Sequence, residues 1–288
     1  MLPKFLPTRH ALLALCLSAL LAPALLPAAN APPPPSAVVA APVAATPPQP
    51  GPRLDAALAR WKKVDWDAAV QADQLKFLNL VQQRCSETIF DFSARFFKQE
   101  RINGELQDEE AADMKWRGSP FSVYMKYVLG DEGREVLYVA GQYDNKIQGH
   151  PGGWLGALIK VQVAPDDPSV LKTNLRPITA AGMINMISVI VAQCELARSH
   201  GDLQLQYVGK IEAGGRPAYA IKRLLPNKPI YPNKELVILI DCAALVPVGS
   251  DGYGWDGQLL TKYHFTDFKL NVGLPDRDFD RSNKDYGF

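Results

Sequence analysis

The residues best suited to acid–base or metal chemistry are three histidines beyond the N-terminal segment, at positions 150, 200 and 264. None has a second His, a Cys or a carboxylate at the spacing of metal-ligand pairs. His150 lies beside the glycine-rich turn Pro151–Gly153, and His264 faces opposite to the aromatic residues on either side of it in a strand-like stretch. These positions favour hydrogen-bonding roles over metal ligation.

Two glycine- or acid-rich motifs resemble ligand sites, but their surroundings do not fit. Gly252–Gly257 matches G-x-G-x-x-G, yet a period-2 strand follows where a dinucleotide site needs a helix. Asp276–Asp280 has the spacing of a calcium loop, but Arg281 replaces its glycine and Gly287 its glutamate. The chain also contains no G-x-S-x-G, H-E-x-x-H, C-x-x-C or P-loop. We therefore expect no catalytic residue, no metal and no cofactor.

The N-terminal region is typical of an exported protein. Residues 1–31 combine a basic start, an apolar run from Ala11 to Leu26 and small residues before a cleavage site near Ala31, which predicts a secretory signal peptide. The alternative is an uncleaved anchor in the inner membrane. Residues 32–52 are rich in Pro and Ala and carry no charge, which predicts a disordered tether before a single domain at 53–288. We expect a periplasmic location.

Charge and cysteine content narrow the function further. Because the leader contains Lys4 and Arg9, 29 of the 31 basic residues remain in the mature chain against 30 acidic ones, a net charge of −1. This balance gives no electrostatic footprint for nucleic acid. Three cysteines remain, Cys85, Cys194 and Cys242, and their apolar neighbours favour small buried side chains. One disulfide is the alternative, and the sequence does not decide its pairing.

The spacing of apolar residues predicts an α+β fold. Helical spacing covers residues 53–87 and 179–198, whereas alternating apolar and polar residues predict strands from residue 88 to 150 and again from 203 to 270. Short turns such as Asn103-Gly104 join these strands, as in an antiparallel meander. We expect about ten or eleven strands in a strongly curved antiparallel sheet, with helices covering one face.

Several stretches resemble the DUF1571 family of uncharacterised proteins, which is in turn distantly similar to the LolA/LolB lipoprotein-carrier superfamily. That resemblance implies an unclosed barrel with helices on its concave side, around a hollow that takes up acyl chains. It also draws attention to His150 as a polar site, whereas Glu100 and Arg134 are expected to form cross-strand ion pairs. The matching stretches are Phe97–Ile102, Pro120–Lys126, Gly133–Val139, His150–Gly153, Pro177–Thr179 and Asp278–Asp280, with Asn283 and Tyr286–Phe288.

Aromatic and methionine residues on neighbouring strands and on the second helix offer a wall for such a hollow. In one interpretation they are ordinary core under the helices; in the other, part of that face lines an apolar cavity. The helix around Met183–Cys194 and the loop Pro151–Pro177 are the expected movable cover. The candidate cavity wall is Phe92, Phe96, Trp116, Phe121, Met125, Tyr127, Tyr138, Met183 and Ile187.

The favoured function is a non-catalytic, monomeric periplasmic binding protein that holds a lipid acyl chain or a lipoprotein. A structural module that binds an envelope protein partner is the first alternative. An enzyme that uses His150 is the second, and it requires a carboxylate or hydroxyl close to that ring in a cleft.

Overall fold

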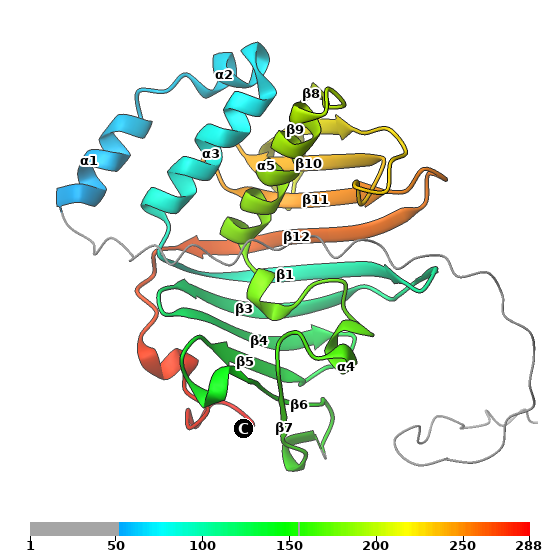
Figure 1. Cartoon of the computed structure of the whole chain (residues 1–288). Helices are drawn as coiled ribbons and strands as arrows, with labels where there is room; N and C mark the ends of the chain where they lie inside the picture. The colour runs from blue at the N-terminus through cyan, green and yellow to red at the C-terminus, as the bar shows by residue number, and fades with distance from the viewer. Residues whose placement is uncertain (1–51, 155) are drawn as a thin grey trace, which may run out of the picture. The chain divides into compact units, whose positions relative to one another are not determined.

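The computed structural model describes residues 52–154 and 156–288, so the expected leader and nearly all of the expected tether lie outside the described residues. An antiparallel sheet of twelve strands runs through the described part, with helices on one of its faces (Figure 1). The helices are α1 Pro52–Trp61, α2 Trp66–Ala72, α3 Gln74–Thr88, α4 Pro168–Leu171 and α5 Met183–Ser199, with short 3-10 turns η1 Tyr143–Asn145, η2 Gly156–Leu158, η3 Ile178–Ala180 and η4 Asp276–Phe279.

The strands follow the turns that the sequence predicts. The hairpin at Asn103-Gly104 joins the first two strands, and both of its residues have positive φ (52° and 87°), as a tight two-residue turn requires. The strands are β1 Asp91–Ile102, β2 Glu105–Leu106, β3 Glu110–Gly118, β4 Phe121–Leu129, β5 Glu135–Val139, β6 Ile147–His150, β7 Val161–Val163, β8 Gln204–Ala213, β9 Arg216–Leu224, β10 Glu235–Asp241, β11 Pro247–Tyr253 and β12 Leu259–Leu270.

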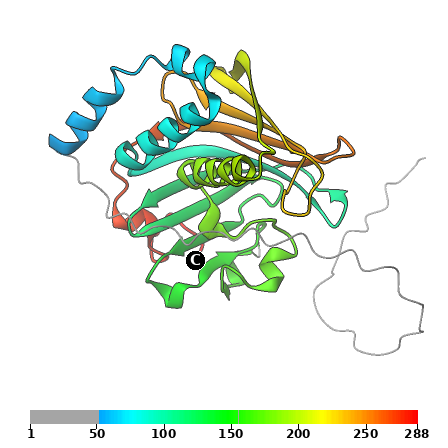
Figure 2. The ribbon, with the colours of Figure 1, turned by 45° about the horizontal axis from the view of Figure 1, so that its top comes forward.

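Two meanders meet in the middle of this sheet. The strand order is β7-β6-β5-β4-β3-β1-β12-β11-β10-β9-β8, and β2 pairs with β1 beside this path. β1 pairs with β12 from Phe92 opposite Leu270 to Glu100 opposite Thr261, which joins the first meander to the second. The two ends of the path, β7 and β8, do not pair with each other, so the sheet is not closed. The predicted α+β class with an unclosed, curved antiparallel sheet is confirmed (Figure 2).

Helices α2 and α3 begin at aspartates that cap them. The Asp65 carboxylate accepts a hydrogen bond from the Ala68 N–H at 3.0 Å, and Asp73 accepts one from Lys76 at 2.9 Å. These side chains satisfy backbone donors that the first helical turn leaves unpaired, and such caps are typically worth about 1 kcal/mol. They fix where the helical layer starts against the sheet.

Helix α5 begins at Met183, four residues later than the sequence predicts, because the chain bends at Gly182. Gly182 has φ +104°, and a Cβ at this position would lie only 2.5 Å from the indole Nε1 of Trp116. The residue therefore needs to be glycine both for its backbone angle and for the close approach of Trp116. The 3-10 turn η3 occupies the residues that were expected to be helical.

The core fills the space between α3, α5 and half of the sheet. The side chains of Phe77 on α3, Met183 and Ile187 on α5, and Phe92 on β1 are fully buried. Phe92 stacks on Trp116 with a centroid distance of 5.3 Å. Burial of each such side chain stabilises the fold by roughly 1.5–3 kcal/mol, so the contact of α5 with the sheet is a main part of the fold.

The cysteines contribute to this core as free thiols. Cys85 and Cys194 are buried and Cys242 is half-buried, as the apolar neighbours predicted, and none of the three forms a disulfide. Burial raises the pKa of Cys85 to about 12, which keeps that thiol protonated and unreactive. No helix in the described residues has the length and apolar character needed to cross a membrane.

Candidate functional site

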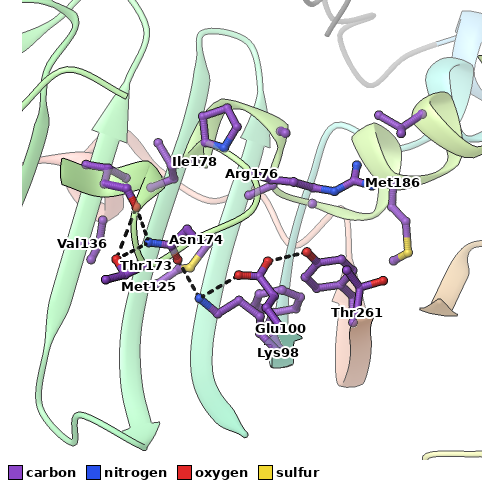
Figure 3. A pocket seen from close by; sticks show the side chains of 18 of the residues that line it. Lys98, Glu100, Met125, Val136, Thr173, Asn174, Arg176, Ile178, Met186 and Thr261 are labelled. Atoms are coloured by element: carbon purple, nitrogen blue, oxygen red, sulfur yellow. Dashed lines mark hydrogen bonds and ion pairs between the residues drawn. The ribbon is translucent and has the colours of Figure 1, made fainter. Parts of the chain in front are cut away.

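A cavity of about 390 Å³ lies between the sheet, α5 and the segment that leads into α5. Its volume falls within the range of about 300–1,000 Å³ that is common for small-molecule sites. Figure 3 shows this pocket, with Met125 and Val136 contributed by the sheet, Ile178 by the segment before α5 and Met186 by α5. Most of its walls are aliphatic or aromatic side chains.

Three of the nine expected wall residues line this cavity, and six do not. Phe96, Met125 and Tyr127 contribute to the lining. The sheet face is thus hollow beside Phe96, whereas Phe92 on the same strand is fully buried in the core. The six that lie outside the lining are Phe92, Trp116, Met183 and Ile187 in the main core, Phe121 packed against that core, and Tyr138, which is buried.

His150 also lies outside the cavity, under the C-terminal residues. Its Nδ1 is 2.8 Å from the Pro151 carbonyl oxygen and its Nε2 is 3.6 Å from the nearer carboxylate oxygen of Glu135. The Phe288 ring meets it edge-on at 5.6 Å, and the Gly287 N–H donates to Glu135 at 2.9 Å. The carboxylate that a catalytic histidine needs is present, but tail residues cover the pair where a substrate would have to bind. This is the geometry of a structural hydrogen-bonding residue.

The floor of the cavity carries charges on β1, on the same side of the strand as Phe96. Lys98 lies 2.9 Å from a carboxylate oxygen of Glu110 and 3.8 Å from one of Glu100. Arg134 reaches the other oxygen of Glu110 at 2.6 Å, across the strands as expected for that arginine. Desolvation raises the pKa of Glu110, but Lys98 and Arg134 outweigh this effect, and the pKa lies below its usual value. Glu110 is therefore a carboxylate at neutral pH.

These floor residues also hold the segment that precedes α5. Lys98 Nζ donates to the Asn174 side-chain oxygen at 2.6 Å, and the Leu175 N–H donates to Glu100 at 3.1 Å. Glu100 also accepts a short hydrogen bond from the Tyr263 hydroxyl. Figure 3 shows Asn174 and Lys98 linked in this way inside the pocket. The segment is thus fastened to the sheet by polar contacts, whereas α5 is fastened by apolar burial.

A second polar group lies beside the cavity, around an arginine that the sequence pattern did not single out. Arg223 on β9 is fully buried and forms no ion pair with the described residues. It donates to the side-chain oxygens of Gln193 at 3.0 Å and Asn233 at 2.7 Å, and both of these residues line the cavity. Burial lowers the pKa of the Arg223 guanidinium, but an arginine stays protonated in proteins. The sequence did contain a signal for this residue, because Arg223 lies two residues after Ile221 and four after Tyr219 in a strand and therefore shares their face of the sheet.

The site is built for binding. Among residues 52–154 and 156–288, no three His, Cys, Asp or Glu side chains come together as metal ligands would. The carboxylates that resembled a calcium loop form ion pairs instead, Asp276 with Arg117 and Asp278 with Lys115. The cavity combines mostly apolar walls with a few charged and polar side chains.

A comparison of the sequence with family profiles shows to which family the chain belongs. The profile described as "Protein of unknown function (DUF1571)" matches residues 89–288, and the chain belongs to this family, as its resemblance predicted. A comparison with curated proteins finds no match.

Solved structures with a similar course of the chain have low sequence identity. They include MucB (14% identity, TM-score 0.43, 72% of this chain and 62% of that chain). Another is the lipoprotein LppX of Mycobacterium tuberculosis (13%, TM-score 0.42, 72% and 98%). A third is a LolA superfamily protein of Nitrosomonas europaea (9%, TM-score 0.30, 71% and 97%). The chain therefore spans less than two thirds of MucB, and these values carry no information about a ligand.

Proposed function

We propose that this protein is an exported, non-catalytic binding protein that holds a lipid acyl chain in the cavity between the sheet and α5. The observation that carries the proposal is the cavity itself, which Phe96, Met125 and Tyr127 of the sheet line together with Met186 and Ile190 of α5. Elsewhere on the same face, side chains such as Phe92 are fully buried in the core.

Burial alone supplies enough free energy for such a role. Transfer of a sixteen-carbon chain out of water contributes about 12 kcal/mol, at about 0.8 kcal/mol per methylene. The cost of immobilising the ligand and ordering the site offsets part of this gain. Micromolar binding, which needs about 8 kcal/mol, is therefore within reach without any covalent step.

The cavity can be filled by one substitution at its rim. Ala181 lines the cavity just before α5, so Ala181→Trp places a large side chain where an acyl chain would lie. Ala192→Trp on the exposed side of α5 is the matched control. We expect Ala181→Trp to reduce uptake of a fluorescent fatty acid about tenfold or more, because the site has lost volume, and the control to bind as wild type.

The measurement starts with the protein recovered from the periplasmic fraction, and native mass spectrometry first determines whether lipid co-purifies. Circular dichroism verifies that both variants fold. Equal uptake by the two tryptophan variants, or no lipid and no uptake by wild type, contradicts acyl-chain binding in this cavity. Absence of the protein from the periplasmic fraction contradicts export.

A further inference from the structure

The charges around the cavity do not balance. Three cations and one carboxylate line it. Arg223 and Glu110 bond to lining residues from behind, and with them the net charge is +2. Lys98 and Arg134 are neutralised on the floor by Glu110 and Glu100, so the excess belongs to two arginines. The six groups are Lys98, Arg134, Arg176, Arg223, Glu100 and Glu110.

The two remaining arginines lie near each other, at the end of the cavity that Gln193 and Asn233 line. The Arg176 guanidinium also lies over the Tyr263 ring, 5.8 Å from its centroid. Arg176 lines the cavity and, like Arg223, forms no ion pair within the described part of the chain. Its charge is close enough to that of Arg223 to lower the pKa of Arg223, in addition to the larger effect of burial. Figure 3 shows the Arg176 side chain extended towards the α5 side of the cavity, where Met186 lies. The nearby Cys194 thiol supplies no negative charge, because burial raises its pKa.

Arg223 also determines which way the amides beside it point. A guanidinium only donates hydrogen bonds, so the groups that receive its bonds must be the oxygens of Gln193 and Asn233. The NH₂ groups of both side chains therefore face away from Arg223. Neither NH₂ group donates a hydrogen bond to any described residue, and neither is fully enclosed by protein. The cavity end thus presents free donors.

Two hydroxyls and a glycine complete this end. Ser250 and Thr261 line the cavity beside Asn233. A Cβ on Gly252 would lie 2.7 Å from the Thr261 hydroxyl and 3.0 Å from the Asn233 amide nitrogen. The two polar groups therefore converge on one spot that a larger residue at position 252 would fill.

We propose that this end of the cavity binds the anionic head, a carboxylate or a phosphate, of a single-chain amphiphile whose tail lies against Phe96, Met125 and Tyr127. The inference rests on the proposed acyl-chain binding. A carboxylate or phosphate oxygen accepts from the NH₂ groups of Gln193 and Asn233 and from the Arg176 guanidinium. It also supplies the negative charge that buried Arg223 lacks in the described residues.

The test compares ligands that differ only in the head: palmitate, its uncharged methyl ester and the lysophosphatidic acid with the same chain. We expect wild type to bind palmitate or the lysophosphatidic acid about tenfold or more tightly than the ester, as one charge-assisted hydrogen bond provides. Whichever anion binds more tightly identifies the source of the head, a free fatty acid or a phospholipid.

The substitution Gln193→Glu tests the same anion site by a change in the protein instead of the ligand. The new carboxylate has the shape of the amide and pairs with Arg223, so the fold is retained while the site loses its excess charge. We expect both anions to bind about tenfold more weakly and the ester within about threefold of wild type. Gln206→Glu on the exposed face of β8 is the control and keeps all affinities.

The outcomes separate the two proposals. If the ester binds wild type as tightly as the anions, or if Gln193→Glu leaves anion binding unchanged, the anionic-head assignment is wrong while acyl-chain binding stands. If none of the three ligands binds wild type, both proposals fail. Thermal unfolding of Gln193→Glu establishes that its loss of binding is not loss of fold.

Discussion

At the scale of single residues, Asp241 at the end of β10 is the most heavily bonded carboxylate outside the cavity. It is 1% exposed and accepts hydrogen bonds from Arg216 and from the N–H groups of Ala243 and Ala244, at 2.9 and 2.6 Å. Desolvation raises its pKa, but the Arg216 bond and the backbone donors outweigh this, and the pKa lies below its ordinary value.

The lowered pKa of Asp241 predicts that the fold loses stability in acid. Because the folded-state pKa is depressed, ionised Asp241 stabilises the fold above its unfolded pKa of about 3.9, and this stability is lost as the pH falls below that value. We expect Asp241→Asn to lower the free energy of unfolding by about 1–3 kcal/mol at pH 7.

Urea unfolding at pH 7 and pH 3 measures this effect. The gap between wild type and Asp241→Asn narrows at pH 3, where the Asp241 carboxyl of the unfolded wild-type chain is largely protonated. Asp55→Asn on the exposed side of α1 serves as the control and changes stability by less than about 0.5 kcal/mol. A gap of the same size at both pH values contradicts the role of the ionised form.

At the scale of elements, α5 is a wall of the cavity that is packed into the core along one side, which argues against the predicted role of this helix as a movable cover. Met183, Ile187, Cys194 and Ala197 are fully buried along one side of this helix. The residues before it, around Asn174, are held by hydrogen bonds to the floor. We therefore expect any opening of the cavity to involve this preceding segment.

A pair of truncations in α5 checks its structural role. Ile187→Ala removes a fully buried side chain and is expected to cost about 2–5 kcal/mol of unfolding free energy. Leu196→Ala in the same helix removes a side chain that is 42% exposed and is expected to cost less than about 1 kcal/mol. Similar urea midpoints for the two variants are incompatible with α5 as a packed wall.

The extent to which sequence predicts this site can be seen on β1. The alternation of Phe92 and Phe96 with polar residues predicts that both face the same side, and they do. The alternation does not show that Phe92 is core and Phe96 lines a cavity, because this difference depends on contacts between residues that are distant in the sequence, such as the stacking of Trp116 on Phe92. The alternation along β9 places Arg223 on the buried face of that strand. Its hydrogen-bond partners come from a helix and a loop, so the sequence could not predict that no carboxylate among the described residues pairs with it.

At the scale of the whole molecule, the C-terminal residues return to the first meander. Tyr286 stacks on Tyr124 of β4 with a centroid distance of 3.9 Å and receives a hydrogen bond from Lys115 at 3.1 Å. Phe279 in η4 is 2% exposed. The last ten residues thus cover the outer side of strands that form the cavity floor on their inner side.

Removal of this cover is expected to destabilise the sheet as a unit. We expect Tyr286→Ala to lower the melting temperature by roughly 5 °C or more, because an aromatic stack and its hydrogen bond are lost. Lys284→Ala, at an exposed position in the same tail, is the control and is expected to melt within about 1 °C of wild type. Equal melting temperatures for the two variants contradict a structural role for the tail.

The pairing of β1 with β12 has a consequence for the order of events in the cell. Glu100 on the cavity floor lies opposite Thr261 on β12, the last strand in the described residues. A chain that is exported from its N-terminus therefore leaves β1 without its second neighbour until almost all residues have crossed. Such long-range pairing forms late and slowly. On the proposed export and acyl-chain binding, ligand uptake is therefore the final step of maturation, and we expect a chain that stalls during translocation to carry no ligand.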